Sequence, residues 1–375
     1  MPTPFDSGFL GSMAVKNRFV RSATWEGMAD DDGSCSSRLV DLTRELAKGE
    51  VGLIISGHAL VSPEGQTSPR QIAVYDGRFV PGLKQMTEAA HEGGSKIVAQ
   101  LAHAGLQAVA SLTQRDVVGP SSVTSEGRVL GRAMTPQQIE QTIQSFTRAA
   151  EWSQQAGFDG VQIHAAHGYL LSQFLSPHFN KRTDEYGGSI RNRARLVLAI
   201  LEKIKAALGA TFPVLIKMNS DDFIDGGLTV EEMLRISEML EDAGIDGIEL
   251  SGGTVDGAGR YNPARRGRLK SQRQEVYYRE AAKRFKERIG VPLLLVGGIR
   301  SYTVAEDLIQ KGMADYISLS RPFIREPHLI ARWKSGDREK SACRCCNLCY
   351  KPIQDGEGMY CVTAARERER KSAAE

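Results

Sequence analysis

The middle of the chain alternates between short apolar runs and longer stretches in which apolar residues recur every three or four positions. Runs rich in Val, Ile and Leu, without polar alternation, are typical of parallel strands buried on both faces. Such runs predict eight strands, at 17–23, 51–60, 96–103, 160–165, 213–219, 247–253, 292–298 and 316–323. The stretches between them predict helices.

The helical stretches carry start signals. Thr135, Pro136 and Gln138 predict an N-terminal cap, a proline at the first helical position and a capping box. Apolar residues then recur at 139, 143, 146 and 150, as one helix face requires, and Gly157 predicts the end of the helix. Two further capping boxes are predicted at Thr229 with Glu232 and at Thr303 with Glu306.

A weak internal repeat indicates repeated strand–helix units. Residues 156–163 read AGFDGVQI, residues 243–250 read AGIDGIEL, and residues 311–317 are a looser copy. Eight such units joined by right-handed crossovers predict an α/β fold, a single (β/α)8 TIM barrel over residues 1–335. The alternative, an open doubly wound sheet, should carry G-x-G-x-x-G after an early strand, and we find none. Residues 336–375 predict a short Cys-rich extension with a charged tail.

Composition narrows the class of protein. The chain has 375 residues, of which 41% are hydrophobic and 25% charged, as in an ordinary soluble globular protein. The net charge of +3 gives no reason to expect nucleic acid or an anionic membrane surface as a partner. We find no apolar run of the roughly 18 residues that a spanning helix needs. The first residues lack a signal-peptide pattern, which predicts a cytoplasmic protein.

Candidate chemistry gathers at the strand ends, because the carboxyl ends of barrel strands form the site in this fold. Gly297 and Gly298 allow close backbone approach after the seventh strand, and Arg321 offers a forked cation after the eighth. This is the usual phosphate site of such barrels, although turn glycines and a surface arginine are the alternative. The other strand-end residues are Ser22, Ala23, Thr24, Gly57, His58, Gln100, His164, His167, Tyr169, Lys217, Ser251 and Gly253.

His164, His167 and Tyr169 form the sharpest local signal. The histidines could donate hydrogen bonds to one substrate oxygen, and the tyrosine could deliver a proton. They could instead bind a metal, for which a nearby carboxylate would be expected, or they could be structural. The remaining isolated histidines receive no role; they are His58, His91, His178 and His328.

The segment that begins at His164, and the sequence after it, resemble the old yellow enzyme family of FMN-dependent barrel oxidoreductases. The resemblance rests on HAAHGYLLSQFLSP at 164–177, NKRTDEYGGS at 180–189 and the pair Asn192–Arg193. Similar segments stand at 16–20, 100–105 and 320–323, so the resemblance covers about residues 1–335.

The resemblance implies roles for the matching residues. Thr24 and Gln100 would hydrogen-bond the flavin ring, and Lys217 would lie near its N1 atom. His164 and His167 would bind the activating oxygen of the substrate, and Tyr169 would protonate its α-carbon. The resemblance thus implies an ene reductase that uses NAD(P)H to reduce an alkene conjugated to a carbonyl or nitro group. The other cofactor contacts would be Ser22, Ala23 and Gly57 at the ring, and Gly253, Gly297, Gly298, Ser320 and Arg321 at the phosphate.

Five of the six cysteines lie between residues 343 and 361. Cys343, Cys346 and Cys349 are three apart, and Cys361 follows, a spacing that suits a tetrahedral thiolate site. It resembles the [4Fe–4S] site of trimethylamine dehydrogenase and 2,4-dienoyl-CoA reductase, larger members of the family. Structural zinc is the alternative. Cys345 has no assigned role, and Cys35 is expected to be a free thiol.

Those larger relatives continue into further domains, so we expect electrons to come from NAD(P)H or from an electron-transfer protein. A second interpretation is an electron-transfer flavoprotein subunit that relays charge between FMN, the cluster and a partner protein. A third is a flavin-free barrel lyase with a zinc-bound tail. We expect a small-molecule alkene as substrate and a homo-oligomer.

Overall fold

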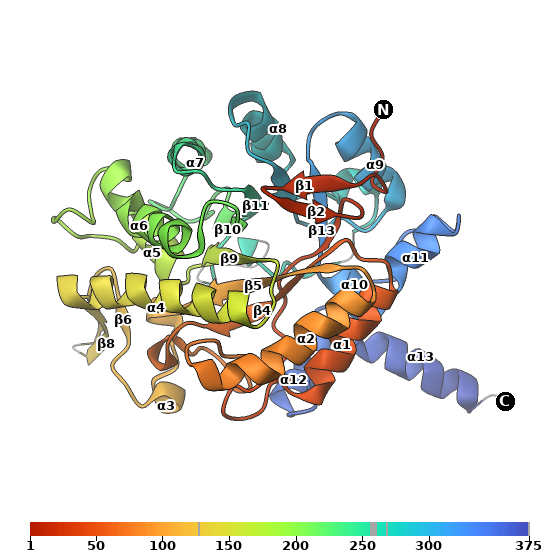
Figure 1. Ribbon diagram of the computed structural model, residues 1–375, viewed down its shortest axis with the longest axis horizontal. Helices are drawn as coiled ribbons and strands as arrows, with labels where there is room; N and C mark the ends of the chain where they lie inside the picture. Colours follow the sequence, from red (N-terminus) through yellow and green to blue (C-terminus); the bar gives the residue numbers. More distant parts are fainter. Residues whose placement is uncertain (127, 256–260, 268, 374–375) are drawn as a thin grey trace.

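The computed structural model describes residues 1–126, 128–255, 261–267 and 269–373. Eight parallel strands close into a barrel (Figure 1), which confirms the predicted fold class. In barrel order, these strands are β3 (Phe19–Arg21), β4 (Leu53–Leu60), β5 (Lys96–Ala102), β9 (Gly160–Ala165), β10 (Val214–Asn219), β11 (Gly247–Ser251), β12 (Leu293–Leu295) and β13 (Tyr316–Leu319).

Helices surround the barrel, and each strand is followed by at least one of them (Figure 1). They are α1 (Ser37–Lys48), α2 (Val80–Glu92), α4 (Pro136–Gln155), α5 (Leu170–Leu175), α6 (Ile190–Leu208), α7 (Val230–Asp242), α8 (Arg279–Arg288), α9 (Tyr302–Gln310), α10 (Arg321–Arg325) and α11 (Leu329–Lys334). Shorter elements between them are α3 (Ala110–Thr113) and 3-10 turns at Pro63–Gly65, Gly77–Phe79, Gly105–Gln107 and Gln272–Gln274.

Two of the three predicted capping boxes are confirmed. Thr135 caps α4 with Gln138, and Thr229 caps α7 with Glu232. The third was wrong, because α9 begins one residue before Thr303, after Ser301 as its cap. The Thr303 hydroxyl instead accepts a hydrogen bond from the Gln272 side chain at 2.8 Å. The eighth strand is also shorter than predicted, since α10 begins at residue 321.

The barrel interior is layered. An N-terminal hairpin of β1 (Gly8–Leu10) and β2 (Met13–Val15) inserts Leu10, Met13 and Val15 beneath the strands. They pack with inward-facing residues of the barrel, among them Val20, Val98, Leu215, Leu294 and Tyr316. Because strand side chains alternate with period two, residues two positions further along face the same interior. Four of those positions carry the polar side chains of Ser22, Gln100, Lys217 and Ser318, so the apolar floor supports a largely polar layer.

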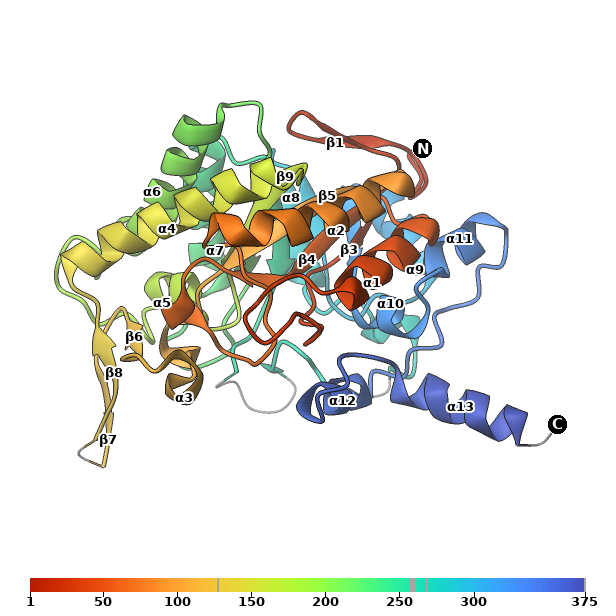
Figure 2. The same cartoon turned by 60° about the horizontal axis from the view of Figure 1, so that its bottom comes forward.

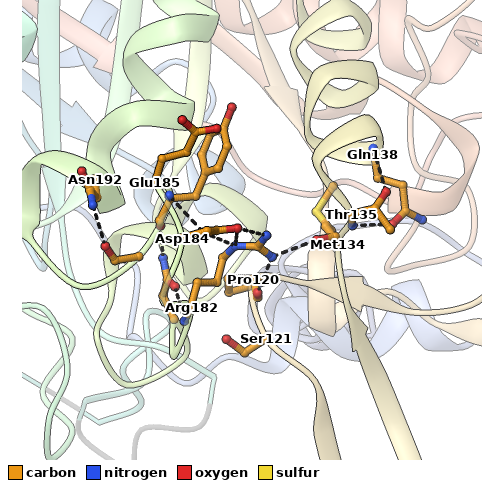
Figure 3. Close-up of polar contacts among 12 residues, drawn as sticks. Pro120, Ser121, Met134, Thr135, Gln138, Arg182, Asp184, Glu185 and Asn192 are labelled. Atoms are coloured by element: carbon orange, nitrogen blue, oxygen red, sulfur yellow. Dashed lines mark hydrogen bonds and ion pairs between the residues drawn. The ribbon is translucent and has the colours of Figure 1, made fainter.

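A second small sheet stands beside the barrel mouth, formed by β6 (Val118–Gly119), β7 (Val123–Ser125) and β8 (Arg128–Ala133). Arg182 ties its base to the barrel (Figure 3). The Arg182 Nη1 group donates to the carbonyls of Pro120 at 2.9 Å and Met134 at 2.8 Å, and its Nε donates to Asp184 at 3.0 Å. The run at 180–189 therefore anchors both ends of this segment.

The C-terminal extension contains a 3-10 turn at Leu348–Tyr350, α12 (Lys351–Gln354) and α13 (Val362–Ser372). It lies on the side of the barrel opposite the β1–β2 hairpin (Figure 2). It therefore borders the mouth at which the strands end. In the part of the chain that the structure describes, no helix has the length and apolar character needed to cross a membrane.

Candidate active site

A pocket of about 370 Å³ opens at the carboxyl ends of the strands. It brings together residues from every barrel strand or the turn after it. The predicted site residues that line it are Ser22, Ala23, Thr24, Gln100, His164, His167, Tyr169, Lys217, Gly297, Gly298, Ser320 and Arg321. A volume of this size is typical of cofactor and substrate sites.

Gly57 and Gly253 are not among the residues that line this pocket. A Cβ at Gly57 would lie 2.2 Å from a carboxylate oxygen of Glu26, so the missing side chain makes room for that carboxylate. Gly253 has a φ of +85°, and a Cβ there would lie 1.8 Å from the Tyr261 carbonyl oxygen. Both glycines thus serve close packing behind the pocket wall.

Strand β9 and the turn after it bring three candidate site side chains close together, those of His164, His167 and Tyr169. His167 and Gly168 have φ values of 65° and 79°, an unusual left-handed pair that bends the chain across the barrel mouth. As a result, the His164 ring centre lies 5.4 Å from that of His167 and 4.8 Å from that of Tyr169. The His167 backbone N–H donates to Asn219 at 3.1 Å, which fixes the turn.

The two histidines have different surroundings. His167 Nε2 lies 2.7 Å from the Ser251 hydroxyl, so one ring nitrogen is already paired. His164 Nδ1 is buried and has no hydrogen-bond partner among the residues described. Burial lowers the pKa of both imidazoles well below the ordinary value, and the Lys217 ammonium lowers it further. Both rings are therefore neutral near pH 7 and can hydrogen-bond a substrate oxygen.

Tyr169 has the opposite shift. Burial raises the pKa of its hydroxyl to about 12, so the phenol keeps its proton throughout the neutral range. Its ring lies edge-on to His58, with ring centres 5.7 Å apart. A protonated phenol beside two neutral imidazoles is a suitable proton donor.

A row of buried polar groups crosses the floor of the pocket. Lys217 Nζ donates to the Ser22 hydroxyl at 2.8 Å and lies 3.2 Å from a Glu249 carboxylate oxygen. Gln162 donates to that same carboxylate at 3.0 Å and accepts from Gln100 at 2.7 Å. The floor therefore presents one cation, held by a buried acid.

The opposite end of the pocket has the features of an anion site. Gly297 and Gly298 have φ values of 127° and 76°, and a Cβ at Gly298 would lie 2.5 Å from the Tyr277 ring. Arg321 Nη1 donates to the Arg265 carbonyl at 2.8 Å and to Asn347 Oδ1 at 2.6 Å, which fixes the guanidinium in the pocket wall. A rigid guanidinium next to exposed backbone suits a phosphate.

Several lining residues have buried polar atoms that lack a partner within the described part of the chain. Trp25 Nε1, His164 Nδ1 and Ser318 Oγ are such atoms, and each is costly unless a ligand completes its hydrogen bonding. Together with the cation on the floor and the anion site, they fit a flat, polar-edged cofactor with a phosphate. The sequence assigned no site role to other lining residues, among them Trp25, His58, Tyr277, Tyr278, Arg300, Ser318 and Tyr350.

The four cysteines of the predicted metal site line one small pocket under α10. Cys343, Cys346, Cys349 and Cys361 share this pocket with Arg321 and Asn347. All are free thiols. Over the described ranges, no three His, Cys, Asp or Glu side chains converge as ligands of one ion would. The four thiols are suitable ligands for a thiolate-bound metal centre. In the described part of the chain, however, their sulfur atoms do not converge on one point.

Comparisons with known proteins show which sequences this chain is similar to. Residues 3–340 match the model of the NADH:flavin oxidoreductase / NADH oxidase family. The chain is 36% identical over 354 residues to an NADH oxidase of Thermoanaerobacter brockii, covering 92% of this chain and 53% of that protein. It is 30% identical over 385 residues to the 4,4'-dithiodibutanoate disulfide reductase of Rhodococcus erythropolis, covering 95% and 94%.

A solved structure is similar as well. The old yellow enzyme homologue from Zymomonas mobilis aligns with a TM-score of 0.77 at 27% identity, covering 92% of this chain and 96% of that one. The chain spans about half the length of the NADH oxidase, since 53% of that protein is covered.

Proposed function

Because the chain belongs to the NADH:flavin oxidoreductase / NADH oxidase family, we propose that it is an FMN-dependent ene reductase. It would reduce the C=C bond of an α,β-unsaturated carbonyl or nitro compound with electrons from NAD(P)H. The observation that carries this proposal is the convergence of His164, His167 and Tyr169 over the Lys217 cation, in one pocket with Arg321. When bound, FMN supplies the hydride chemistry.

Each residue of the proposed site would have its own role. Arg321, Gly297 and Gly298 would hold the phosphate, and Thr24 and Gln100 would bind the edge of the ring. Lys217 would stabilise negative charge at the ring. His164 and His167 would donate hydrogen bonds to the carbonyl or nitro oxygen and orient the alkene. The Tyr169 hydroxyl would give its proton to the α-carbon as the β-carbon receives hydride.

We further propose that Cys343, Cys346, Cys349 and Cys361 hold a [4Fe–4S] cluster, with structural zinc as the alternative. Their shared pocket and free thiols support this proposal. Arg321 lines both this pocket and the active-site pocket, so the two sites share a wall.

The experiment that tests the proposed function begins with the cofactor. Purified protein should carry FMN, and Arg321→Ala should weaken FMN binding by roughly tenfold or more, since hydrogen bonds to charged groups contribute about 1.5–3 kcal/mol each. The native protein should reduce 2-cyclohexenone with NADH or NADPH under anaerobic conditions. Absence of FMN, or full FMN affinity in Arg321→Ala, would contradict these assignments. Arg191→Ala, an exposed site on α6, is the matched control.

A second candidate function is electron transfer between FMN, the cluster and a partner protein. The shared wall favours it, since Cys345 and Tyr350 of the extension line the active-site pocket. The two candidates differ in their substrates. An electron-transfer subunit should accept electrons from a reduced dye as readily as from NADH, and it should leave 2-cyclohexenone and 4,4'-dithiodibutanoate unreduced.

A further inference from the structure

Glu249 is a carboxylate inside an otherwise apolar strand. Its strand, β11, reads Gly-Ile-Glu-Leu-Ser, and the Glu249 side chain is 0% exposed. Placing a charge in a barrel interior costs several kcal/mol unless it is paired. Apolar side chains fill the layer below, so packing alone does not require an acid here.

The contacts of Glu249 lead to the pocket floor. Strands β10 and β11 place Lys217 directly opposite Glu249, and the ion pair spans 3.2 Å. The same carboxylate oxygen accepts from Gln162 at 3.0 Å, while the other oxygen has no partner among the residues described. Glu249 does not line the pocket, whereas Lys217 does. Glu249 therefore acts on the pocket through Lys217, which it contacts directly, and through the Gln162–Gln100 hydrogen bonds.

From this geometry, and resting on the proposed FMN function, we propose that Glu249 is a positioning residue. It keeps Lys217 as an ammonium on the pocket floor while the flavin is oxidised, so that two-electron reduction of FMN takes up a single proton. The balanced step is FMN plus two electrons plus one proton, giving the anionic reduced flavin. NAD(P)H supplies the electrons and that proton together as hydride.

The physical reason lies in the cost of an unpaired buried ammonium. Without the carboxylate, burial favours the neutral amine as long as the flavin is uncharged. Reduction then creates an anion near Lys217, and the amine regains its proton from solvent. Each reduction would take up two protons instead of one.

The other ionisable groups that face Lys217 do not supply this second proton. His164 on β9, His167 after it and His58 on β4 have pKa values lowered by burial, so they stay neutral above pH 7. Burial raises the pKa of Tyr169 to about 12, so it stays protonated. Arg300 and Arg321, across the pocket, remain cationic at every accessible pH. Of the groups named here, only the Lys217–Glu249 pair is expected to change its number of bound protons on reduction.

The test is the midpoint potential of FMN-loaded protein, measured by spectroelectrochemistry between pH 7 and 9. One proton per two electrons gives a slope of about 30 mV per pH unit, and two protons give about 59 mV. We expect the smaller slope for the native protein and for Glu249→Asp, which keeps the charge. We expect the larger slope for Glu249→Gln.

Glu26→Gln is the matched control, because it removes a different buried carboxylate, one paired with Arg21 at 2.6 Å outside the pocket. It should keep the native slope. A native slope in FMN-loaded Glu249→Gln would overturn the proposal. If that variant does not fold, the native protein still decides, since a two-proton slope there would overturn it too. Native protein that binds no FMN would instead overturn the proposed function.

Discussion

Cys345 and Cys346 are neighbours in the chain but line different pockets. Cys345 has a φ of 52° and lines the active-site pocket, whereas Cys346 lines the small pocket with Cys343, Cys349 and Cys361. The left-handed backbone at Cys345 turns the two side chains apart. Cys345 thus lines a different pocket from the four cysteines predicted as ligands, although its thiol is hydrogen-bonded to that of Cys343.

The different pockets of Cys345 and Cys346 predict different effects on metal content. Cys346→Ala should remove most of the iron from anaerobically purified protein, because a tetrahedral site loses one of its four thiolates. Cys345→Ala, the matched control, should keep its iron. Iron, sulfide and zinc analysis of both variants beside the native protein would check this. Iron loss in Cys345→Ala alone would reverse the ligand assignment, and zinc without iron would replace the cluster with a structural site.

Arg182 predicts a stability effect away from the pocket. Its guanidinium donates to the carbonyls of Pro120 and Met134, so Arg182→Ala would leave two backbone acceptors without their charged donor (Figure 3). We expect the free energy of unfolding to fall by roughly 2–4 kcal/mol. Arg191→Ala lies on the exposed face of α6 and should change it by about 0.5 kcal/mol or less. Urea denaturation of both variants measures the difference, and equal stabilities would contradict the anchoring role.

The buried histidines predict acid sensitivity. Burial lowers the pKa of His58 to about 4, while the same group in the unfolded chain titrates at its ordinary value of 6.5. The unfolded chain therefore binds the extra proton, and the stability from this group, present above pH 6.5, is lost as the pH falls toward 4. Each such histidine contributes up to about 1.4 kcal/mol per pH unit in this window.

In His58→Gln, the free energy of unfolding should accordingly decline less steeply between pH 6.5 and 4.5. The slope should be smaller by the contribution of one bound proton, about 1.4 kcal/mol per pH unit. His178→Gln, at an exposed position, should leave the decline as steep as in the native protein. Urea midpoints at several pH values would measure both slopes. Identical slopes in the two variants would mean that His58 is not buried in its neutral form.

The sequence predicted the barrel because its strands are Val-, Ile- and Leu-rich runs separated by capped helices, and those patterns are local. It failed at Thr303 because a cap depends on where the preceding turn ends. Part of the pocket lining was predicted, from the His164–Tyr169 run and the strand-end glycines. Tyr277 reaches the pocket only through tertiary folding, and Glu249 is the one charged residue of its strand. Such residues have no local signal, because their roles depend on partners that are distant in sequence.

The protonated phenol of Tyr169 predicts a selective effect on one half-reaction. With its pKa raised to about 12 by burial, the phenol carries its proton at neutral pH and stands 4.8 Å, centre to centre, from the His164 ring. Transfer of hydride to the β-carbon of an enone would build charge toward the oxygen that we propose the histidines bind, and the α-carbon would then need a proton. Tyr169→Phe removes that proton while keeping the ring. It should therefore leave the reduction of FMN by NADH near normal.

Reoxidation of the reduced Tyr169→Phe variant by 2-cyclohexenone should slow by roughly 10²–10⁴-fold, as is typical for loss of a positioned acid. A nitroalkene should be affected less, because its nitronate product is stable enough to leave before protonation. Tyr186→Phe, whose ring does not line the pocket, is the matched control. His164→Ala should differ from both by weakening enone binding as well as slowing the chemistry. Stopped-flow traces of the two half-reactions separate these effects, and unchanged enone turnover in Tyr169→Phe would assign the proton to solvent or to another residue.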